Sequence, residues 1–412
     1  MRPRIDLARL RADVEAVNEL GRIPGRPGIN RVSFSPQDMA GRRWLIGRMQ
    51  EAGLAARMDP VGNVFGRWEA GRGPAVLAGS HLDTVPDGGP FDGTLGVLAA
   101  LEAVRAMKDA GIAPARPVEV VCTADEEGRF GGMLGSQAIC GEAGAEWIAR
   151  ARDEAGKPLV QALAEAGLDP SPEATAGAAR DLSDIACFLE LHVEQGPVLE
   201  RAAEHIGIAE AVTGVFNWTV TLRGEANHSG TTPMDLRRDA FRGMAEFGAS
   251  IPAILARAGG PDARITVGQA ALAPNFPHSV AGEARFSIIG RDARDEGMQA
   301  MAAACEAEIA KAAGAHGLDF EIDRQSWLPP TRLDAGLADR LEALSRAAGF
   351  ATRRMPSGAG HDAQTFARHV PAGLIFVPSV RGISHAPEEW TEWEDIARGA
   401  QLLADAVAAL AG

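Results

Sequence analysis

Short apolar runs alternate with helix-length amphipathic segments along most of the chain, and this alternation constrains the fold more than any other feature of the sequence. Strands buried on both faces read as short continuous apolar runs, whereas helices need longer periodic segments. The alternation therefore predicts an α/β fold. The predicted strands are residues 74–79, 117–123, 187–193 and 374–377, and the predicted helices include residues 93–107 and 396–410.

The middle of the chain has a different pattern. Residues 216–222 and 284–288 alternate apolar and polar side chains, which is typical of antiparallel strands with one wet face. Helical patterns follow at residues 239–256 and 296–313. We therefore expect an inserted α+β domain at residues 213–330, and a first domain formed by residues 1–212 and 331–412. A chain of 412 residues is long enough for two domains.

Composition excludes several classes of partner. The formal net charge of −14 disfavours binding to nucleic acid or to an anionic membrane, so an anionic substrate needs a local cationic pocket. The N-terminus lacks an apolar signal segment, and no uninterrupted apolar stretch approaches 18 residues. The cysteines Cys122, Cys140, Cys187 and Cys305 are scattered, which predicts buried thiols and a cytoplasmic protein.

Histidines and carboxylates follow several of the predicted strands, where open α/β sheets present their sites. His81 follows the first strand, and Asp83 lies two residues further on, better placed to orient the imidazole than to bind the same ion. Alone, this pair fits a surface histidine beside a carboxylate. Asp92 is flanked by glycines at positions 88, 89 and 93, which fits either close approach to a ligand or a turn with a capping aspartate.

Three further positions extend this set. Asp125, Glu126 and Glu127 follow a buried strand and repel one another unless a cation holds them, although a solvated turn is the alternative. His192 lies inside an apolar strand, and His385 follows a strand and a loop. Taken together, mixed nitrogen and oxygen donors predict a site for Zn, Mn, Co or Ni rather than Ca or Mg.

Longer motifs around these residues carry a specific resemblance. Asp-Glu-Glu-Gly-Arg-Phe at 125–130 and Glu-Leu-His-Val-Glu-Gln-Gly-Pro at 190–197 are the most distinctive. The chain resembles the dinuclear metallo-amidases of the hydantoinase/carbamoylase type, which are related to the co-catalytic zinc peptidases. Within them it is most similar to N-carbamoyl-L-amino-acid hydrolase, allantoate amidohydrolase and β-ureidopropionase. The other matching segments are residues 79–85, 89–93, 226–234 and 357–363.

The resemblance implies a fold and a set of ligands. It implies a central mixed sheet flanked by helices, with an inserted lid and dimerisation domain of four antiparallel strands and two helices. Two divalent ions are implied, with ligands and catalytic groups assigned by motif. His81 and His192 would bind one ion, Glu127 and His385 the other, Asp92 would bridge them, Glu126 would be the general base, and Asp83 would orient His81. A cis peptide at Asp92–Gly93 is also implied.

The resemblance further implies substrate contacts and an assembly. His228 would stabilise the oxyanion, from its own or a partner subunit, and Arg291 would bind a substrate carboxylate through its guanidinium fork. Gln195 and the backbone at Gly358 and Gly360 are secondary candidates. A homodimer through residues 213–330 is implied.

The chain departs from the family pattern near these contacts. His278 replaces an asparagine that touches substrate, Asn217 lies in a changed lid strand, and Ile289-Gly290 precedes Arg291 where the family carries an aspartate and an aliphatic residue. These changes put the substrate, rather than the metal chemistry, in question. The leading hypothesis is a metal-dependent amidohydrolase that acts on an N-carbamoyl or related N-substituted amino acid. The alternatives are a dipeptidase or aminoacylase of the same fold and a metal-dependent binding protein without activity.

Overall fold

The structure is a computed structural model that describes residues 2–412. It divides into two compact units. Unit 1 comprises the chain up to Glu210, Arg332–Met355 and Ala359–Gly412, and unit 2 comprises Ala211–Thr331 and Pro356–Gly358. The expected insert was residues 213–330, so the two divisions differ by a few residues and by the short segment Pro356–Gly358, which the expectation gave to the first domain.

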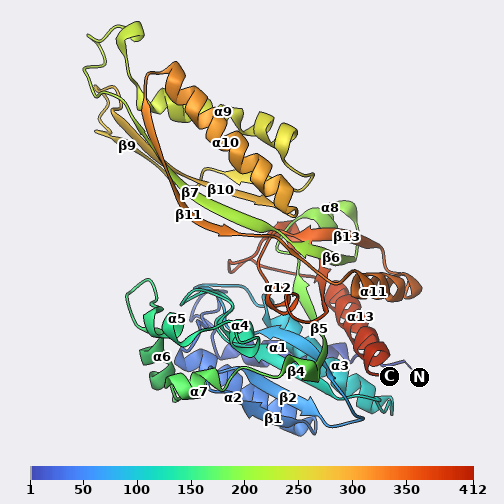
Figure 1. The fold of residues 1–412 in the computed structure, drawn as a ribbon. Helices are drawn as coiled ribbons and strands as arrows, with labels where there is room; N and C mark the ends of the chain where they lie inside the picture. The colour runs from blue at the N-terminus through green and yellow to red at the C-terminus, as the bar shows by residue number, and fades with distance from the viewer. Residues whose placement is uncertain (1) are drawn as a thin grey trace. The chain divides into compact units, whose positions relative to one another are not determined.

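A nine-stranded mixed sheet forms the centre of unit 1 (Figure 1). The order is β1-β2-β4-β3-β5-β14-β6-β12, and β13 also pairs with β6. The pairs β3–β4, β3–β5 and β5–β14 are parallel, whereas β1, β2 and β6 pair in antiparallel fashion. The predicted α/β fold with a mixed sheet is confirmed. The strands are β1 (Ala55–Met58), β2 (Val64–Trp68), β3 (Ala75–His81), β4 (Val118–Thr123), β5 (Ile185–Val193), β6 (Ile206–Val212), β12 (Thr331–Arg332), β13 (Thr352–Ser357) and β14 (Ala372–Val377).

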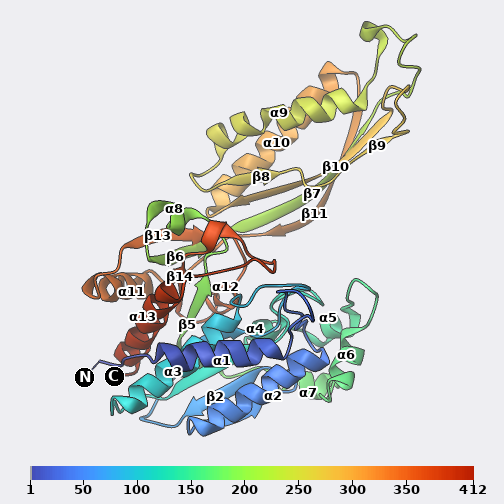
Figure 2. The same cartoon turned by 180° about the vertical axis from the view of Figure 1, so that it is seen from behind.

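Helices pack on this sheet, and its innermost helix is buried on all sides. Residues 94–107 of that helix, α3, are all buried, because it lies against the sheet and is covered by α1 and α13 (Figure 2). A helix surrounded by protein needs no polar face. The long helices of unit 1 are α1 (Leu7–Glu19), α2 (Pro36–Glu51), α3 (Thr94–Asp109), α11 (Ala335–Ala347) and α13 (Trp393–Ala411).

A group of short helices, which the sequence pattern does not predict, separates β4 from β5. The first three of these helices contribute to a small separate cluster of apolar side chains that includes Phe34, Phe130 and Leu163. The helices of the group are α4 (Leu134–Ile139), α5 (Ala145–Arg150), α6 (Leu159–Glu165) and α7 (Pro172–Ala176). The remaining short helices are η1 (Leu182–Asp184), α8 (Val198–Ala202), η2 (Met234–Leu236), α12 (Asp362–Phe366) and η3 (Val380–Gly382).

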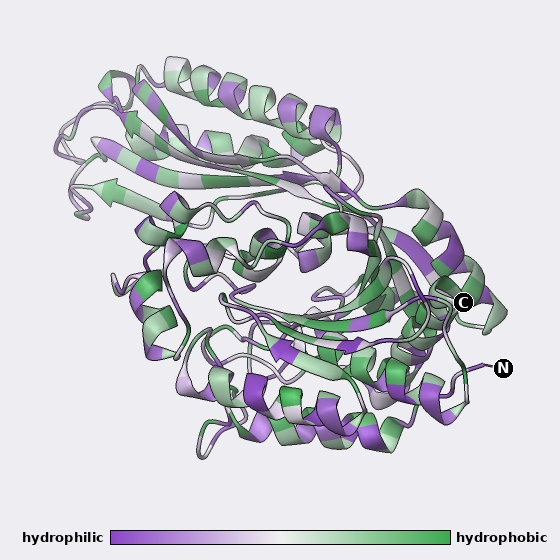
Figure 3. Cartoon of the chain, turned by 60° about the horizontal axis from the view of Figure 1, so that its bottom comes forward, coloured by the Kyte–Doolittle hydropathy of each residue, from purple (hydrophilic) through white to green (hydrophobic). Residues whose placement is uncertain are grey.

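Unit 2 is an antiparallel sheet with two helices on one face. Side chains of β7 and β10 are alternately buried and half-buried, because one face packs on the helices and the other does not. Figure 3 shows that hydrophobic residues (green) and hydrophilic residues (purple) also alternate along the helices. The elements are β7 (Gly214–Arg223), α9 (Ala240–Ala258), β8 (Arg264–Thr266), β9 (Ala270–Ala273), β10 (Glu283–Asp292), α10 (Asp295–Ala315) and β11 (Asp319–Leu328).

The expected count of four strands in this sheet is wrong by one. The order β11-β7-β10-β8 has four positions, but β9 also pairs with β10, at Glu283 to Phe286, whereas β8 pairs with Ile289 to Arg291. The edge of the sheet beside β10 is divided between β8 and β9, because residues 267–269 between these two short strands are not paired as a strand. Among residues 2–412, no helix is both long and apolar enough to cross a membrane.

Candidate metal centre and surrounding groups

The carboxyl ends of the parallel strands bring the candidate ligands of unit 1 together. His81 is the last residue of β3, Glu126 and Glu127 follow β4, His192 is near the end of β5, and His385 follows β14. Parallel neighbours end at the same edge of a sheet, so residues far apart in sequence meet there. The structure places all five beside Asp92, which lies in the turn before α3.

The first group of possible ligands is His81, His192 and Asp92, all buried. Asp92 Oδ1 lies 3.1 Å from His192 Nε2 and 3.6 Å from His81 Nε2. The other ring nitrogens, Nδ1, each lie 2.9 Å from a backbone carbonyl, that of Asp83 for His81 and that of Val193 for His192. A proton on Nδ1 donates to that carbonyl, and Nε2 then faces the carboxylate as a metal ligand would.

The second group is Asp92, Glu127 and His385. Asp92 Oδ2 lies 3.2 Å from His385 Nε2, which in turn lies 3.4 Å from Glu127 Oε2. The two oxygens of Asp92 therefore face different groups, one toward the paired histidines and one toward His385. This is the arrangement that a bridging carboxylate requires.

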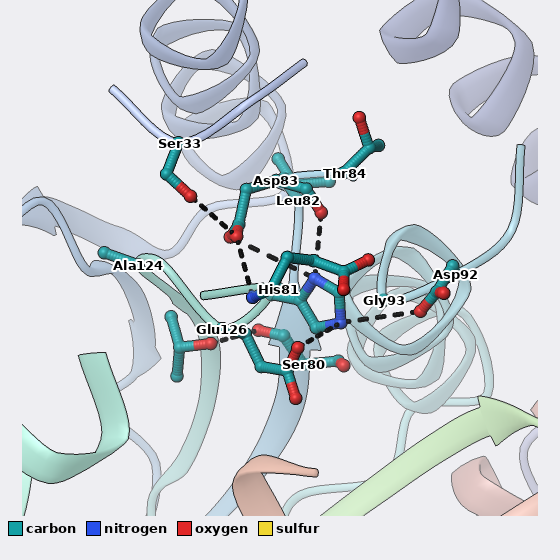
Figure 4. Close-up of polar contacts among 12 residues, drawn as sticks. Ser33, Ser80, His81, Leu82, Asp83, Thr84, Asp92, Gly93, Ala124 and Glu126 are labelled. Atoms are coloured by element: carbon teal, nitrogen blue, oxygen red, sulfur yellow. Dashed lines mark hydrogen bonds and ion pairs between the residues drawn. The ribbon is translucent and has the colours of Figure 1, made fainter. Parts of the chain in front are cut away.

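Glu126 lies at the edge of the first group. Its Oε2 is 3.5 Å from His81 Nε2, and Figure 4 shows Glu126 and Asp92 directed at the same ring. Burial, followed by the charge of Glu127, raises the pKa of Glu126 well above its usual range. A carboxyl group with a raised pKa is suited to accept and return a proton near neutral pH.

The charges of these groups fit divalent cations. Burial and the charge of Asp92 raise the pKa of Glu127 to about 7, and Glu127 Oε1 is buried without a hydrogen-bond partner. Burial alone would raise the pKa of Asp92, but hydrogen bonds from His192 and His385 hold it well below its usual range. A bound cation favours the charged carboxylates and supplies the partner that Glu127 Oε1 lacks. The donor set therefore fits a metal centre.

Asp83 lies beside His81, but its carboxylate was expected to accept the histidine proton and does not. The backbone oxygen of Asp83 is 2.9 Å from His81 Nδ1, whereas carboxylate Oδ1 is 4.0 Å away. The carboxylate instead accepts hydrogen bonds from Ser33 Oγ and the Glu127 backbone, and lies 3.5 Å from the buried Arg42 (Figure 4). These stronger partners draw it away from the ring.

The expected cis peptide at Asp92–Gly93 is wrong for this structure. Among residues 2–412, the cis bond is at Ala273–Pro274, and the bond after Asp92 is trans. A cis form outside proline costs about 3 kcal/mol. The chain turns here through a positive φ of 61° at Gly93, which glycine accepts at low cost. A side chain at this position would collide with the His81 ring, since an added Cβ would lie 2.3 Å from its Cε1.

A hydrogen-bonded group behind Asp92 was largely missed from sequence. Gln195 was expected to contact substrate, but its Nε2 donates to Asp92 Oδ2 at 2.8 Å and to Ser384 Oγ at 3.2 Å. Ser384 donates to Glu389 Oε2 at 2.6 Å, and Glu389 Oε1 accepts the backbone amides of Phe91 and Asp92. The sequence signal that could have indicated this hydrogen-bonded group is Glu389, a carboxylate four residues after His385.

The other missed group lies on the opposite side of the centre. Arg42 and Asp38 are fully buried on α2 and form an ion pair at 3.0 Å. Burial raises the pKa of Asp38, although the charge of Arg42 opposes this. Arg42 also approaches Asp83. The spacing of four residues fits an exposed helix pair equally well, so the sequence pattern by itself does not indicate burial.

Among the expected substrate contacts, Arg291 and Gly358 lie together in unit 2. Arg291 Nη1 donates to the Gly358 carbonyl at 3.0 Å, and desolvation lowers the pKa of Arg291. Asn217 is half-buried in β7 opposite Ile289, on the sheet face away from the helices. Gly360 belongs to unit 1, where an added Cβ would lie 2.8 Å from Met133 Cε.

His228 and His278 lie on neighbouring exposed loops of unit 2. The Ser229 amide donates to the His278 carbonyl, and His228 forms an isolated bridge with Ser279. His228 Nδ1 accepts the amides of Gly230 and Thr231 at 3.1 and 3.2 Å. With Nδ1 accepting, the proton lies on Nε2, which makes His228 a hydrogen-bond donor through its exposed edge.

Comparison with known proteins extends over almost the whole chain. The profile of peptidase family M20/M25/M40 matches residues 77–409. An N-carbamoyl-L-amino-acid amidohydrolase from Paenarthrobacter aurescens is 36% identical over 400 residues, 96% of each chain. An allantoate amidohydrolase from Escherichia coli strain K12 is 37% identical over 392 residues, 92% of each. A hydantoinase/carbamoylase family amidase from Burkholderia phymatum has a similar structure, with a TM-score of 0.91 at 38% identity over 100% of this chain and 99% of that one.

Proposed function

The chain belongs to peptidase family M20/M25/M40, and from that premise we propose which bond it cleaves and which residues act. It is an amidohydrolase, a hydrolase of C–N bonds other than peptide bonds, as are its relatives named N-carbamoyl-L-amino-acid and allantoate amidohydrolase. Its substrate is an N-carbamoyl or related N-substituted amino acid that carries a carboxylate. The observation that carries the proposal is Asp92, whose two oxygens face two separate donor groups in unit 1.

Two divalent ions of Zn, Mn, Co or Ni would be held by these groups. His81 and His192 would hold one ion, Glu127 and His385 the other, and Asp92 both. When bound, the ions would supply Lewis acidity, polarising the substrate carbonyl and lowering the pKa of the attacking water. The mixed imidazole and carboxylate donors support this range of metals over calcium or magnesium.

Glu126 would move the proton. Its carboxylate takes a proton from the water that attacks the ureido carbon, and the acid then returns the proton to the leaving nitrogen. Its burial and its position beside His81 support this role. Glu126→Gln should lower kcat by about 10²–10⁴ while leaving metal content unchanged in elemental analysis. Loss of an ion in Glu126→Gln would exchange the roles of Glu126 and Glu127.

Residues of unit 2 would bind the substrate. The Nε2 donor of His228 would stabilise the developing oxyanion, from the same or a partner subunit, and Arg291 would bind the carboxylate. Asn217, His278 and the Gly358 backbone would contact the rest of the molecule. Asp83 would support His81 through its backbone oxygen, while Gln195 and Gly360 would shape the surrounding loops. We also propose a homodimer. We further propose a cytoplasmic location, which the scattered, buried and unpaired cysteines support.

An ammonia-release screen tests this proposal. The purified protein is incubated with Mn, Co or Zn and with N-carbamoyl amino acids, allantoate, N-acyl amino acids and dipeptides. The expected result is that the wild type releases ammonia and carbon dioxide from a carbamoyl substrate and that Glu126→Gln releases neither. Release of a second amino acid or of a free carboxylic acid would instead identify a dipeptidase or aminoacylase. Metal binding without turnover of any compound would identify a binding protein.

A further inference from the structure

Two arginines lie directly opposite each other on the sheet of unit 2. Arg264 of β8 pairs in register with Arg291 of β10, so their Cβ atoms are about 4.5–5.5 Å apart and their side chains leave the same face. The neighbouring residues Ile265 and Ile288 pack on the helices, which places both arginines on the face away from the helices.

Like charges directly opposite on neighbouring strands destabilise a sheet unless an anion compensates them. In the part of the chain that the structure describes, neither guanidinium pairs with a carboxylate. Arg264 Nη1 donates to the Ala263 carbonyl and Arg291 Nη1 to the Gly358 carbonyl. Asp292, the nearest acid on β10, is buried on the opposite face, where it accepts the amides of Gly260 and Arg294. Two positive charges are therefore held together without a compensating carboxylate, in a chain with a net charge of −14.

The next row of the sheet offers uncharged neighbours. Asn217, Ile289 and Thr266 lie side by side on the same face, so no acid competes there for an anion. A single carboxylate carries one negative charge, so it compensates only one of the two guanidinium charges even when both groups contact it. Two carboxylates compensate both.

We propose that Arg264 and Arg291 together bind a substrate with two carboxylates, which makes the preferred compound the N-carbamoyl derivative of an acidic amino acid. Arg264 is the specificity-determining residue for the second carboxylate. This inference rests on the proposed amidohydrolase function and on the role of Arg291 in it.

The test compares isosteric substrates that differ by one charge. The N-carbamoyl derivatives of L-aspartate and L-glutamate are measured against those of L-asparagine and L-glutamine. The wild type should prefer the diacids by about tenfold or more in kcat/KM. Arg264→Gln should lower kcat/KM for the diacids by roughly tenfold to a hundredfold, mainly through KM, and change it less than about twofold for the amides.

Arg285→Gln is the matched control. Arg285 lies on the same strand and the same face, six residues from Arg291, and the change in charge is identical. This variant should retain the diacid preference. The melting temperature of Arg264→Gln should be equal to or above that of wild type, since the substitution removes a repulsion, and this separates lost binding from lost folding.

Three outcomes would overturn the inference. Equal losses for diacids and amides would mean that both arginines serve one carboxylate. No loss in Arg264→Gln would mean that Arg264 is a solvated strand residue, and an equal loss in Arg285→Gln would mean a general effect of net charge. Calorimetric binding of the same four compounds to Glu126→Gln tests the charge preference without turnover. If the wild type released ammonia from no compound of the wider screen, the proposed function would be refuted, whatever the charge preference measured by this binding experiment.

Discussion

Asp92 is the residue on which the metal centre depends most. Its Oδ1 faces His192 at 3.1 Å and its Oδ2 faces His385 at 3.2 Å, so one side chain belongs to both donor groups. Gln195 and the Glu389 carboxylate hold the side chain and its backbone in this position. If two ions bind as proposed, a residue shared in this way should couple them, so that neither is held at full affinity without it.

Asp92→Ala should therefore lose both ions or bind both much more weakly, because each ion loses a charged ligand. Metal content after dialysis against buffered zinc or manganese, measured by elemental analysis, gives the stoichiometry without any assay of activity. Asp262→Ala, at an exposed position in the loop before β8, is the control and should retain the wild-type content. Two ions at wild-type affinity in Asp92→Ala would remove this residue from the centre.

Arg291 is the residue for which substrate binding can be tested most directly. Arg291→Ala should mainly raise KM, because the contact with a carboxylate exists in both the ground state and the transition state. The expected loss in kcat/KM corresponds to about 2–4 kcal/mol, as for a charge-assisted pair that loses one partner. Arg291→Lys should recover part of it, since a point charge cannot form the guanidinium fork. An unchanged kcat/KM in Arg291→Ala would move carboxylate recognition to another residue, with His278 the first to test.

At this scale, residue type and position after a strand were enough to predict which side chains meet. His81, His192 and His385 could be grouped because each lies at or after a strand that reads as buried. What the sequence could not supply is the partner of each polar atom. The carboxylate and backbone oxygens of Asp83 could both accept a hydrogen bond from His81. The carboxylate lies toward Arg42 instead, and this contact forms only when α2 packs on the sheet.

The turn before α3 and the segment after β14 contact each other in unit 1. Glu389 Oε1 accepts the amides of Phe91 and Asp92 at 2.9 and 3.0 Å. The Phe91 ring also meets Trp390 and Trp393 edge-on, at centroid distances of 5.2 and 5.5 Å. The loop that carries Asp92 and the loop that carries His385 are therefore joined by polar and aromatic contacts.

Glu389→Ala should destabilise the fold and weaken metal binding together. It leaves two buried amides without an acceptor, at about 1–3 kcal/mol each, which urea unfolding of the metal-free protein would measure. Glu389→Gln keeps one carbonyl acceptor and should recover most of the stability. Metal titration of both variants separates the effects, because a purely structural role predicts a lower free energy of unfolding with unchanged metal affinity in the folded state.

Elements with strong periodicity were predicted with bounds close to those observed, as for α3 and β5. The short helices between β4 and β5 were not, because helices of five to seven residues carry too few periods to detect. The division of one edge position into β8 and β9 was also missed. Strands of three and four residues pair because of the partner strand β10 and carry no clear sequence signal of their own.

On the scale of the whole molecule, the change from continuous apolar runs to alternating ones predicts an insert at residues 213–330, whereas unit 2 comprises Ala211–Thr331 and Pro356–Gly358. Unit 1 holds the candidate metal ligands and Glu126, whereas unit 2 holds His228, Asn217, His278 and Arg291. The departures from the family pattern all fall in unit 2. The chemistry of hydrolysis could therefore be predicted from sequence more firmly than the identity of the substrate.

Unit 2 also carries a surface that predicts a homodimer. Along the solvent face of α9, most exposed or half-buried positions that repeat at helical spacing are small or apolar, although the charged residues Arg242 and Glu246 also lie on this face. The small or apolar positions are Phe241, Ala245, Gly248, Ala249, Pro252, Ala253 and Ala256. The corresponding positions of α10 include Gln299, Glu306 and Lys311. An apolar helix face next to the short edge strand β8 is suited to pair with a second copy about a two-fold axis.

We therefore expect sedimentation to give twice the mass of one chain. Ala249→Arg should shift the protein to monomers, because a two-fold axis brings both new charges to one interface, and like charges there cost several kcal/mol. Ala310→Arg, at an exposed position on α10, should leave the dimer intact. A monomeric, active wild type would exclude both the dimer and an oxyanion donor supplied by a partner. A dimer unaffected by Ala249→Arg would place the interface on another face, with the exposed edge of β11 as the next to test.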